Sequence, residues 1–285
     1  MTKLTRREFS RLAAGMAAAG FCSPLFAEGG LSRSLPPYTG PWKPLFNGRN
    51  LTGWSFYQDG VGTTNTTDSV VVESEVIHML GPRHKGGDRP GFGHIATEGE
   101  YGNYHLRLEF KFGEKRFEPR LLAKRNSGVL YHMFPQRDRV WPNSVELQLQ
   151  ESDVGDAILI NTRCYPGADL GGTPAWPDQR PDLIARPKFP SPAESRPEIE
   201  RQLVRKNGDF EKIEYWNTIE LLAIEDRAAQ LVNGRIVNTL YELVGQDLQD
   251  RNSYHPLTKG RIGLEIEGAE VFFRNVEIRN FATNQ

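Results

Sequence analysis

The stretch YHLRLEFKF, which runs from Tyr104 to Phe112, indicates the fold class of this 285-residue chain. Apolar side chains occupy every second position in it, and the positions between them are polar or charged: His105, Arg107, Glu109 and Lys111. Strict alternation is typical of a β-strand with one face in an apolar core and the other in a polar environment. The stretch therefore predicts a strand in a sheet that packs against an apolar core on one face and has a polar opposite face.

Other segments continue this pattern along the chain. SVVVESEVIHML (residues 69–80), SGVLYHMF (127–134), GRIGLEIEG (260–268) and EVFFRNVEIRNF (270–281) are rich in branched and aromatic residues. Asn233-Gly234 lies between two apolar stretches, which is a strong short-range signal for a β-hairpin. We find no convincing amphipathic helix and no alternation of strands with helices. The sequence predicts an all-β, antiparallel β-sandwich.

One segment interrupts the series of strands. Residues 161–200 contain eight prolines and include GADLGGTPAWPDQRPDL. A long irregular insertion in a compact domain is usually functional or disordered. Tyr165, Trp176 and Phe189 argue against simple disorder, because aromatic side chains need packing or a ligand. We expect a long Pro-rich loop that folds over one end or face of the sandwich.

The N-terminus carries a targeting pattern. Arg6 and Arg7 precede Phe9, an apolar run of small residues follows, and Ala27 marks a cleavage point. The run is shorter than the roughly 20 residues that a membrane-spanning helix needs, and no later segment is long enough either. We interpret residues 1–27 as a twin-arginine signal peptide, residues 28–41 as a linker and residues 42–285 as the domain. Export by this signal predicts a periplasmic or extracellular location. Lipidation at Cys22 is the weaker alternative to cleavage after Ala27.

Charge and cysteine content narrow the function classes. The formal net charge is −1 and no long basic cluster occurs, which argues against a nucleic-acid partner. Neither a P-loop nor a dinucleotide motif is present, so we expect no nucleotide cofactor. After removal of residues 1–27 the chain keeps only Cys164, which excludes an intramolecular disulfide. We expect Cys164 to be a buried thiol rather than a nucleophile.

Several motifs together resemble a known family. PLFNGRNLTGW (residues 44–54), NSGVLYHMF (126–134), VWPNSVELQLQESDVGD (140–156) and GRIGLEIEGAEVFFRNVEIR (260–279) occur in the order and spacing of the 3-keto-disaccharide hydrolase domain family, DUF1080. The resemblance covers about residues 42–281. It implies a concanavalin-like jelly-roll sandwich with a carbohydrate site on its concave sheet, activity on sugars oxidised at C3 and, in some members, a divalent metal ion.

The implied chemistry needs a base, an acid and a positive group near the C3 carbonyl oxygen. We expect His132 and Glu146 to form the acid/base or metal-binding centre, with Glu151 as a further catalytic residue. The polar positions of neighbouring strands supply candidates for sugar binding: Arg107, Glu109, Arg125, Asn126 and Gln148. Trp141 and Trp176 are candidate stacking platforms. We expect His84 and His94 to be solvated loop residues.

Two other functions fit the same sequence. Glu146, Gln148 and Glu151 have the i, i+2, i+5 spacing of laminarinase-type retaining glycosidases, although Gln148 stands where those enzymes have Asp. That function requires a β-bulge after Gln148, because strict alternation places Glu146 and Glu151 on opposite faces, and carboxyl groups about 5–5.5 Å apart. A non-catalytic carbohydrate-binding module is the second alternative.

Overall fold

A computed structural model describes residues 36–134, 138–166 and 201–282, without the side chain of Arg201. Residues 1–27, most of the expected linker, and residues 167–200 with Trp176 and Phe189 lie outside this part of the chain. The twin-arginine segment and the Pro-rich loop therefore stay predictions. The described part has no helix that is long and apolar enough to cross a membrane.

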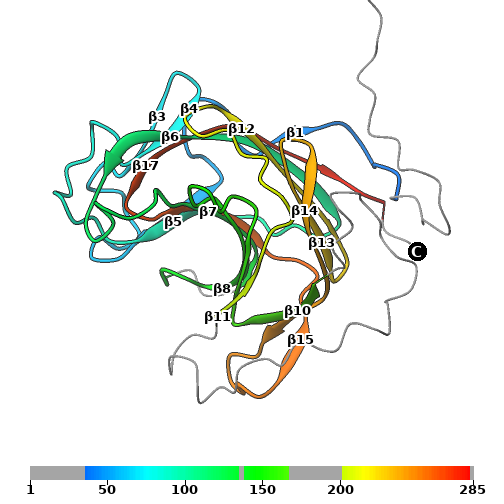
Figure 1. The fold of residues 1–285 in the computed structure, drawn as a ribbon. Coiled ribbons are helices and arrows are strands. Elements are labelled where there is room, and N and C mark those ends of the chain that lie inside the picture. The colour runs from blue at the N-terminus through cyan, green and yellow to red at the C-terminus, as the bar shows by residue number, and fades with distance from the viewer. Residues whose placement is uncertain (1–35, 135–137, 167–200, 283–285) are drawn as a thin grey trace, which may run out of the picture.

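The described strands form two antiparallel sheets (Figure 1). One sheet is ten-stranded, with the order β10 (Thr162–Pro166), β14 (Arg235–Gln246), β13 (Arg227–Val232), β12 (Asn217–Ile224), β6 (Tyr104–Arg116), β17 (Ala269–Asn280), β4 (Val76–Met79) and β3 (Val70–Glu73). β1 (Lys43–Pro44) pairs with β17, and β15 (Tyr254–Pro256) pairs with β14.

The other sheet is seven-stranded. Its order is β11 (Arg201–Val204), β9 (Ala157–Ile160), β8 (Asn143–Gln148), β7 (Gly128–Phe134), β16 (Arg261–Ile266), β5 (Gly93–Thr97) and β2 (Trp54–Gln58). Figure 1 shows β5, β7 and β8 inside the curve made by β17, β6, β12, β14 and β10, so the seven-stranded sheet is the inner layer.

The hydrophobic core lies between the two sheets and follows the alternation of the strands. Leu106, Leu108 and Phe110 of β6 belong to the same buried cluster as Val145 and Leu147 of β8. Every second residue of a strand points to the same face, so the polar residues between these apolar ones lie on the outer faces of the sandwich. The prediction of an all-β antiparallel sandwich is confirmed.

Two local features match the physical expectations for their residues. Asn233 and Gly234 join β13 to β14, and both have positive φ, 50° and 76°, as a tight hairpin turn requires. At the N-terminal end, Tyr38 forms an isolated bridge with Phe281, which extends the line of β1 along β17. The part of the expected linker from Tyr38 onward thus contacts the sheet.

Candidate functional site

A cluster of three carboxylates lies on the face of the seven-stranded sheet that points away from the core. Glu146 comes from β8, Glu265 comes from β16, and Glu267 follows β16 directly. One carboxylate oxygen from each of the three lies within 4.8 Å of the other two, and all three side chains are buried. Alternation explains their shared face, because the residues between them (Val145, Leu147, Leu264 and Ile266) belong to the core.

Gly128 of β7 makes room for this convergence. β7 lies between β8 and β16, and Gly128 pairs with Gln148. A β-carbon built on Gly128 would lie 2.3 Å from Oε2 of Glu265 and 2.7 Å from Oε1 of Glu146. Gly128 is not among the glycines with positive φ, so its backbone would accept another residue. The space that Glu146 and Glu265 share, rather than the backbone conformation, requires glycine here.

Glu267 is held by two hydrogen-bond donors and lies near one cation. The side-chain amide of Asn126 donates to Oε2 of Glu267, and Nε1 of Trp141 donates to Oε1 at 3.1 Å. Nη2 of Arg120 lies 3.6 Å from Oε2 of Glu267. These contacts offset part of the cost of burying the side chain of Glu267, since its oxygens keep hydrogen-bond partners and have a cation nearby.

Two amide oxygens complete a set of oxygen donors on this face. Asn126 is 3% exposed and its Oδ1 has no hydrogen-bond partner in the described protein. Gln148 is 7% exposed and the same holds for its Oε1. A buried polar atom without a partner is costly, so these atoms indicate a site that is completed by a ligand or by ordered water.

The cluster is bordered on β5 and β2 by His94 and Tyr57. Glu265 pairs with His94, which in turn pairs with Tyr57, so the three side chains lie in one row across the sheet. Burial lowers the pKa of His94 to about 4, and the positive charge of Arg261 acts in the same direction, while the Val140 backbone opposes them. His94 is therefore a neutral, buried imidazole beside the cluster, and our prediction of a solvated loop histidine is wrong.

His132 lies in the sandwich interior instead of on the carboxylate face. The pairing of β7 with β8 shifts by one residue between Tyr131 and Phe134, and His132 has φ 52°. Its ring contacts Tyr104 and Tyr131 of the core at centroid distances of 5.9 and 5.5 Å. The structure thus does not bring His132 together with Glu146, and a bulge that the alternation did not reveal is the reason.

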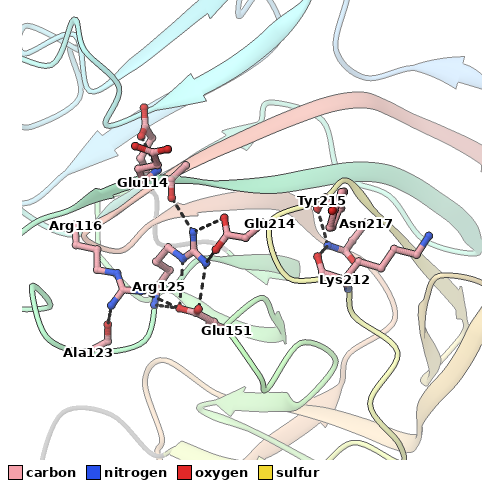
Figure 2. A network of polar contacts seen from close by, with 11 residues as sticks. Glu114, Arg116, Ala123, Arg125, Glu151, Lys212, Glu214, Tyr215 and Asn217 are labelled. Atoms are coloured by element: carbon pink, nitrogen blue, oxygen red, sulfur yellow. Dashed lines mark hydrogen bonds and ion pairs between the residues drawn. The ribbon is translucent and has the colours of Figure 1, made fainter.

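Glu151 and Arg125 form an ion pair with each other and do not join the carboxylate cluster. Arg125 donates to Oε1 of Glu151 at 3.1 Å and also binds Glu214, as Figure 2 shows. It is 5% exposed, donates to the carbonyl oxygen of Gly113 at 2.9 Å and lies over the ring of Phe112. This network ties the ends of β7 and β8 to the loop that carries Glu214.

The backbone rules out the carboxylate pair that the retaining-glycosidase alternative requires. The N–H of Leu149 donates to Ser127 and that of Glu151 donates to Arg125, so the register in which Gln148 pairs with Gly128 continues without a bulge. Glu151 therefore has the same parity as the core residue Leu149, opposite to Glu146. Its pKa is lowered chiefly by its hydrogen bond with Arg125, as in a stable ion pair.

Arg107 and Glu109 belong to the other sheet. Both lie on β6, where Nε of Arg107 donates to Glu277 at 3.0 Å and Arg274 donates to Glu109 at 2.7 Å. Their strand neighbours Leu106, Leu108 and Phe110 fill the core, so these charges lie on the outer face of the ten-stranded sheet. The structure therefore does not bring Arg107 and Glu109 together with Glu146, since the alternation of charged residues does not reveal which sheet a strand joins; their role in sugar binding stays a prediction.

The donor set fits a hard divalent cation. Glu146, Glu265 and Glu267 offer carboxylate oxygens, and Asn126 adds an amide oxygen on the same face. Oxygen-only sites suit Mg²⁺, Ca²⁺ or Mn²⁺. Sequence reasoning missed Glu265 and Glu267, although they alternate with Leu264 and Ile266 just as Glu146 and Gln148 alternate with Val145 and Leu147.

Several solved structures are similar to this chain at low sequence identity. A candidate glycosyl hydrolase from Parabacteroides distasonis is 20% identical, with 85% of this chain and 94% of that chain covered and a TM-score of 0.49. The β-glucanase of Bacillus licheniformis is 12% identical (86% and 100% covered, TM-score 0.45). The carbohydrate-binding module CBM66 of Bacillus subtilis is 10% identical (79% and 93% covered, TM-score 0.45). These likenesses concern the fold alone.

Among curated protein sequences, none matches the chain significantly. Residues 41–279 match the family described as the 3-keto-alpha-glucoside-1,2-lyase-like domain, which is most of the chain. The motifs around Asn126, Glu146 and Glu265 all fall within this match. The chain therefore belongs to the 3-keto-alpha-glucoside-1,2-lyase-like domain family.

Proposed function

We propose that the protein cleaves 3-keto-glycosides by elimination across C1 and C2 followed by hydration, at the cluster of Glu146, Glu265 and Glu267. The observation that carries this proposal is the convergence of three buried carboxylates over a glycine that leaves space for them. Burying three such groups side by side is unfavourable for stability alone, which points to a functional reason for the cluster.

The reaction follows from the acidity of a sugar that carries a ketone at C3. A base removes the proton from C2, and the electron pair delocalises onto the C3 carbonyl oxygen as an enolate. The enolate then expels the substituent at C1, whose oxygen takes up a proton as it leaves, and a C1–C2 double bond forms. Water adds its oxygen to C1 and a proton to C2, so the net change is hydrolysis of the glycosidic bond.

We assign Glu146 as the base that takes the C2 proton. Glu265 is fully buried and Glu267 is fixed by Asn126 and Trp141, so both suit a holding role. Glu265, Glu267 and the amide oxygen of Asn126 would hold a divalent cation, which supplies polarisation of the C3 ketone when bound. Trp141, half-buried beside Glu267, offers an aromatic face to the sugar ring.

Arg261 and His94 can stabilise the negative charge that develops on the enolate oxygen beside the carboxylate cluster. Arg261 is 3% exposed and its cation acts on the pKa of His94, which places the two groups close together. A buried cation beside the site favours an enolate over the neutral ketone, because charge interactions are strong where water is excluded. Neutral His94 can accept a hydrogen bond from a sugar hydroxyl or donate one to it.

We further propose that the mature domain acts outside the cytoplasm after twin-arginine export. The support is the sequence of residues 1–27 alone. N-terminal sequencing of the protein recovered from the periplasm or medium tests this: a start near Glu28 is expected. Recovery of the intact chain from the cytoplasm would contradict it.

The test of the activity uses two substrates and one chelator. The mature protein is incubated with 4-nitrophenyl 3-keto-α-glucoside and with its unoxidised parent, before and after treatment with EDTA, and release of nitrophenolate is recorded. We expect cleavage of the keto substrate only, loss after EDTA and recovery on addition of Mg²⁺, Ca²⁺ or Mn²⁺. Cleavage of both substrates would favour a classical glycosidase, and binding without cleavage would favour a carbohydrate-binding module.

A further inference from the structure

A second group of buried polar side chains lies between the two sheets, apart from the carboxylate face. Tyr104 of β6, His132 of β7 and Gln230 of β13 are each 0% exposed. Within the described protein, the hydroxyl of Tyr104, Nε2 of His132 and Oε1 of Gln230 have no hydrogen-bond partner. Native proteins seldom leave such atoms unsatisfied in an apolar core, because each would lose its hydration without compensation.

Ring contacts and one hydrogen bond connect the three side chains, in part through Tyr131. The ring of His132 makes edge-on contacts with the rings of Tyr104 and Tyr131. Nε2 of Gln230 lies 3.2 Å from the hydroxyl of Tyr131, which links the ten-stranded sheet to the seven-stranded one. Burial raises the pKa of Tyr131 well above its usual value, and Tyr104 acts in the same direction, which places the two rings near each other. The group therefore bridges the two layers.

The backbone is shaped to place His132 there. A left-handed φ of 52° is strained for a non-glycine residue, and the register shift in β7 turns the ring into the core. Gly260 faces this bulge: a β-carbon built on it would lie 2.4 Å from the carbonyl carbon of His132. A strained residue beside a glycine that accommodates it is typical of a β-bulge that places one side chain in a specific position.

The protonation of the group identifies what it can bind. Burial lowers the pKa of His132 to about 4 and raises the pKa of Tyr104 well above its usual range, so both are neutral near pH 7. Nδ1 of His132 lies 3.1 Å from the carbonyl oxygen of Leu257, so it carries the hydrogen and Nε2 is an acceptor. Two acceptors, Nε2 and Oε1, and one hydroxyl donor therefore face the interior.

We propose that Tyr104, His132 and Gln230 form an internal binding site for ordered water between the sheets. A water molecule donates to Nε2 of His132 and to Oε1 of Gln230 and accepts from the Tyr104 hydroxyl. This matches the three hydrogen bonds that a buried water usually makes. Because none of the three groups carries charge, this low-dielectric interior favours a water molecule over an ion. The site explains the conformation of His132 without any role in the chemistry at Glu146.

The sign of one substitution tests this site. Tyr104→Phe removes a hydroxyl: if that hydroxyl binds water, the melting temperature falls, by about 2–4 °C for the loss of one net hydrogen bond in a domain of this size. If the hydroxyl is unpaired in a dry core, its removal raises the melting temperature instead. Tyr101→Phe, on the neighbouring half-buried ring, is the matched control and should change little.

A crystal structure of the unmodified protein at high resolution decides the matter even if the variant does not fold. We expect a density peak within hydrogen-bonding distance of at least two of the three atoms, and loss of that peak in Tyr104→Phe. A stabilised Tyr104→Phe protein, or an interior without such a peak, would overturn the proposal. Neither result depends on the activity proposed above.

Discussion

Gly128→Ala is the sharpest perturbation of the carboxylate cluster, because it adds one methyl group and changes no charge. The new β-carbon would lie 2.3 Å from Glu265 and 2.7 Å from Glu146, whereas ordinary van der Waals contact begins near 3.4 Å. The carboxylates must therefore move apart by about 1 Å. A misplacement of about 1 Å in a catalytic group can cost on the order of 100-fold in rate.

The expected cost in stability is smaller. Overpacking a well-packed position costs about 1–3 kcal/mol, and replacing glycine by alanine at a compatible backbone conformation returns about 0.4–1 kcal/mol. A net loss of about 1.3 kcal/mol lowers the melting temperature by roughly 3–5 °C in a domain of this size. The variant should fold at room temperature and lose function there.

The assay follows nitrophenolate release from the keto substrate at 20 °C, with folding checked by thermal melting. Gly263→Ala is the control, because Gly263 lies on the same face of β16 as Glu265. Its β-carbon would lie 2.7 Å from the sulfur of the flexible Met133 side chain and would not approach a carboxylate. We expect Gly263→Ala to retain most of the turnover. Full turnover by a folded Gly128→Ala protein would refute the assignment of this cluster as the site.

Three further predictions follow from the same contacts. Glu265→Gln, which removes one charge but keeps the shape, should lower kcat/KM for the keto substrate at least about 100-fold, whereas Glu109→Gln on the outer sheet should leave it unchanged; equal effects would count against the site. Arg125→Met should lower the free energy of unfolding in urea by about 3 kcal/mol, because it leaves Glu151 and Glu214 without their buried cation, and an unchanged urea midpoint would contradict this. His94 and His132 both have a pKa lowered to about 4 by burial, so each contributes stability that is complete above the unfolded pKa near 6.5 and is lost as the pH falls toward 4; between these values the free energy of unfolding should fall by up to about 2.7 kcal/mol per pH unit. A pH-independent urea midpoint from pH 6.5 to 4.5 would show that these histidines are not buried in the neutral form.

The inner layer of the fold could be predicted because alternation is a local property. Val145, Leu147 and Leu149 share the core face, and Glu146 and Gln148 share the opposite face, as the sequence pattern required. The Asn233-Gly234 hairpin was predictable for a similar reason, since a tight turn depends on the φ values of its own two residues.

The site could be predicted only in part. Glu146, Gln148, Asn126 and Trp141 do meet on one face, but His132, Glu151, Arg125, Arg107 and Glu109 do not join them. His132 was misplaced by a one-residue bulge, and Glu151 by the absence of one after Gln148. A bulge reverses the side on which the following residues point, and nothing in the local pattern reports it.

The sequence by itself determined which residues of each strand are apolar and which are polar, and through this the two-layer sandwich and its family. Only the tertiary structure decided which polar faces meet. Glu265 and Glu146 are 119 positions apart in the sequence. They become neighbours because β7 lies between β8 and β16, and because Gly128 of β7 leaves the space between them free of a side chain. Strand order and register depend on pairing between distant segments, so the site they assemble is a property of the folded sheet rather than of any one strand.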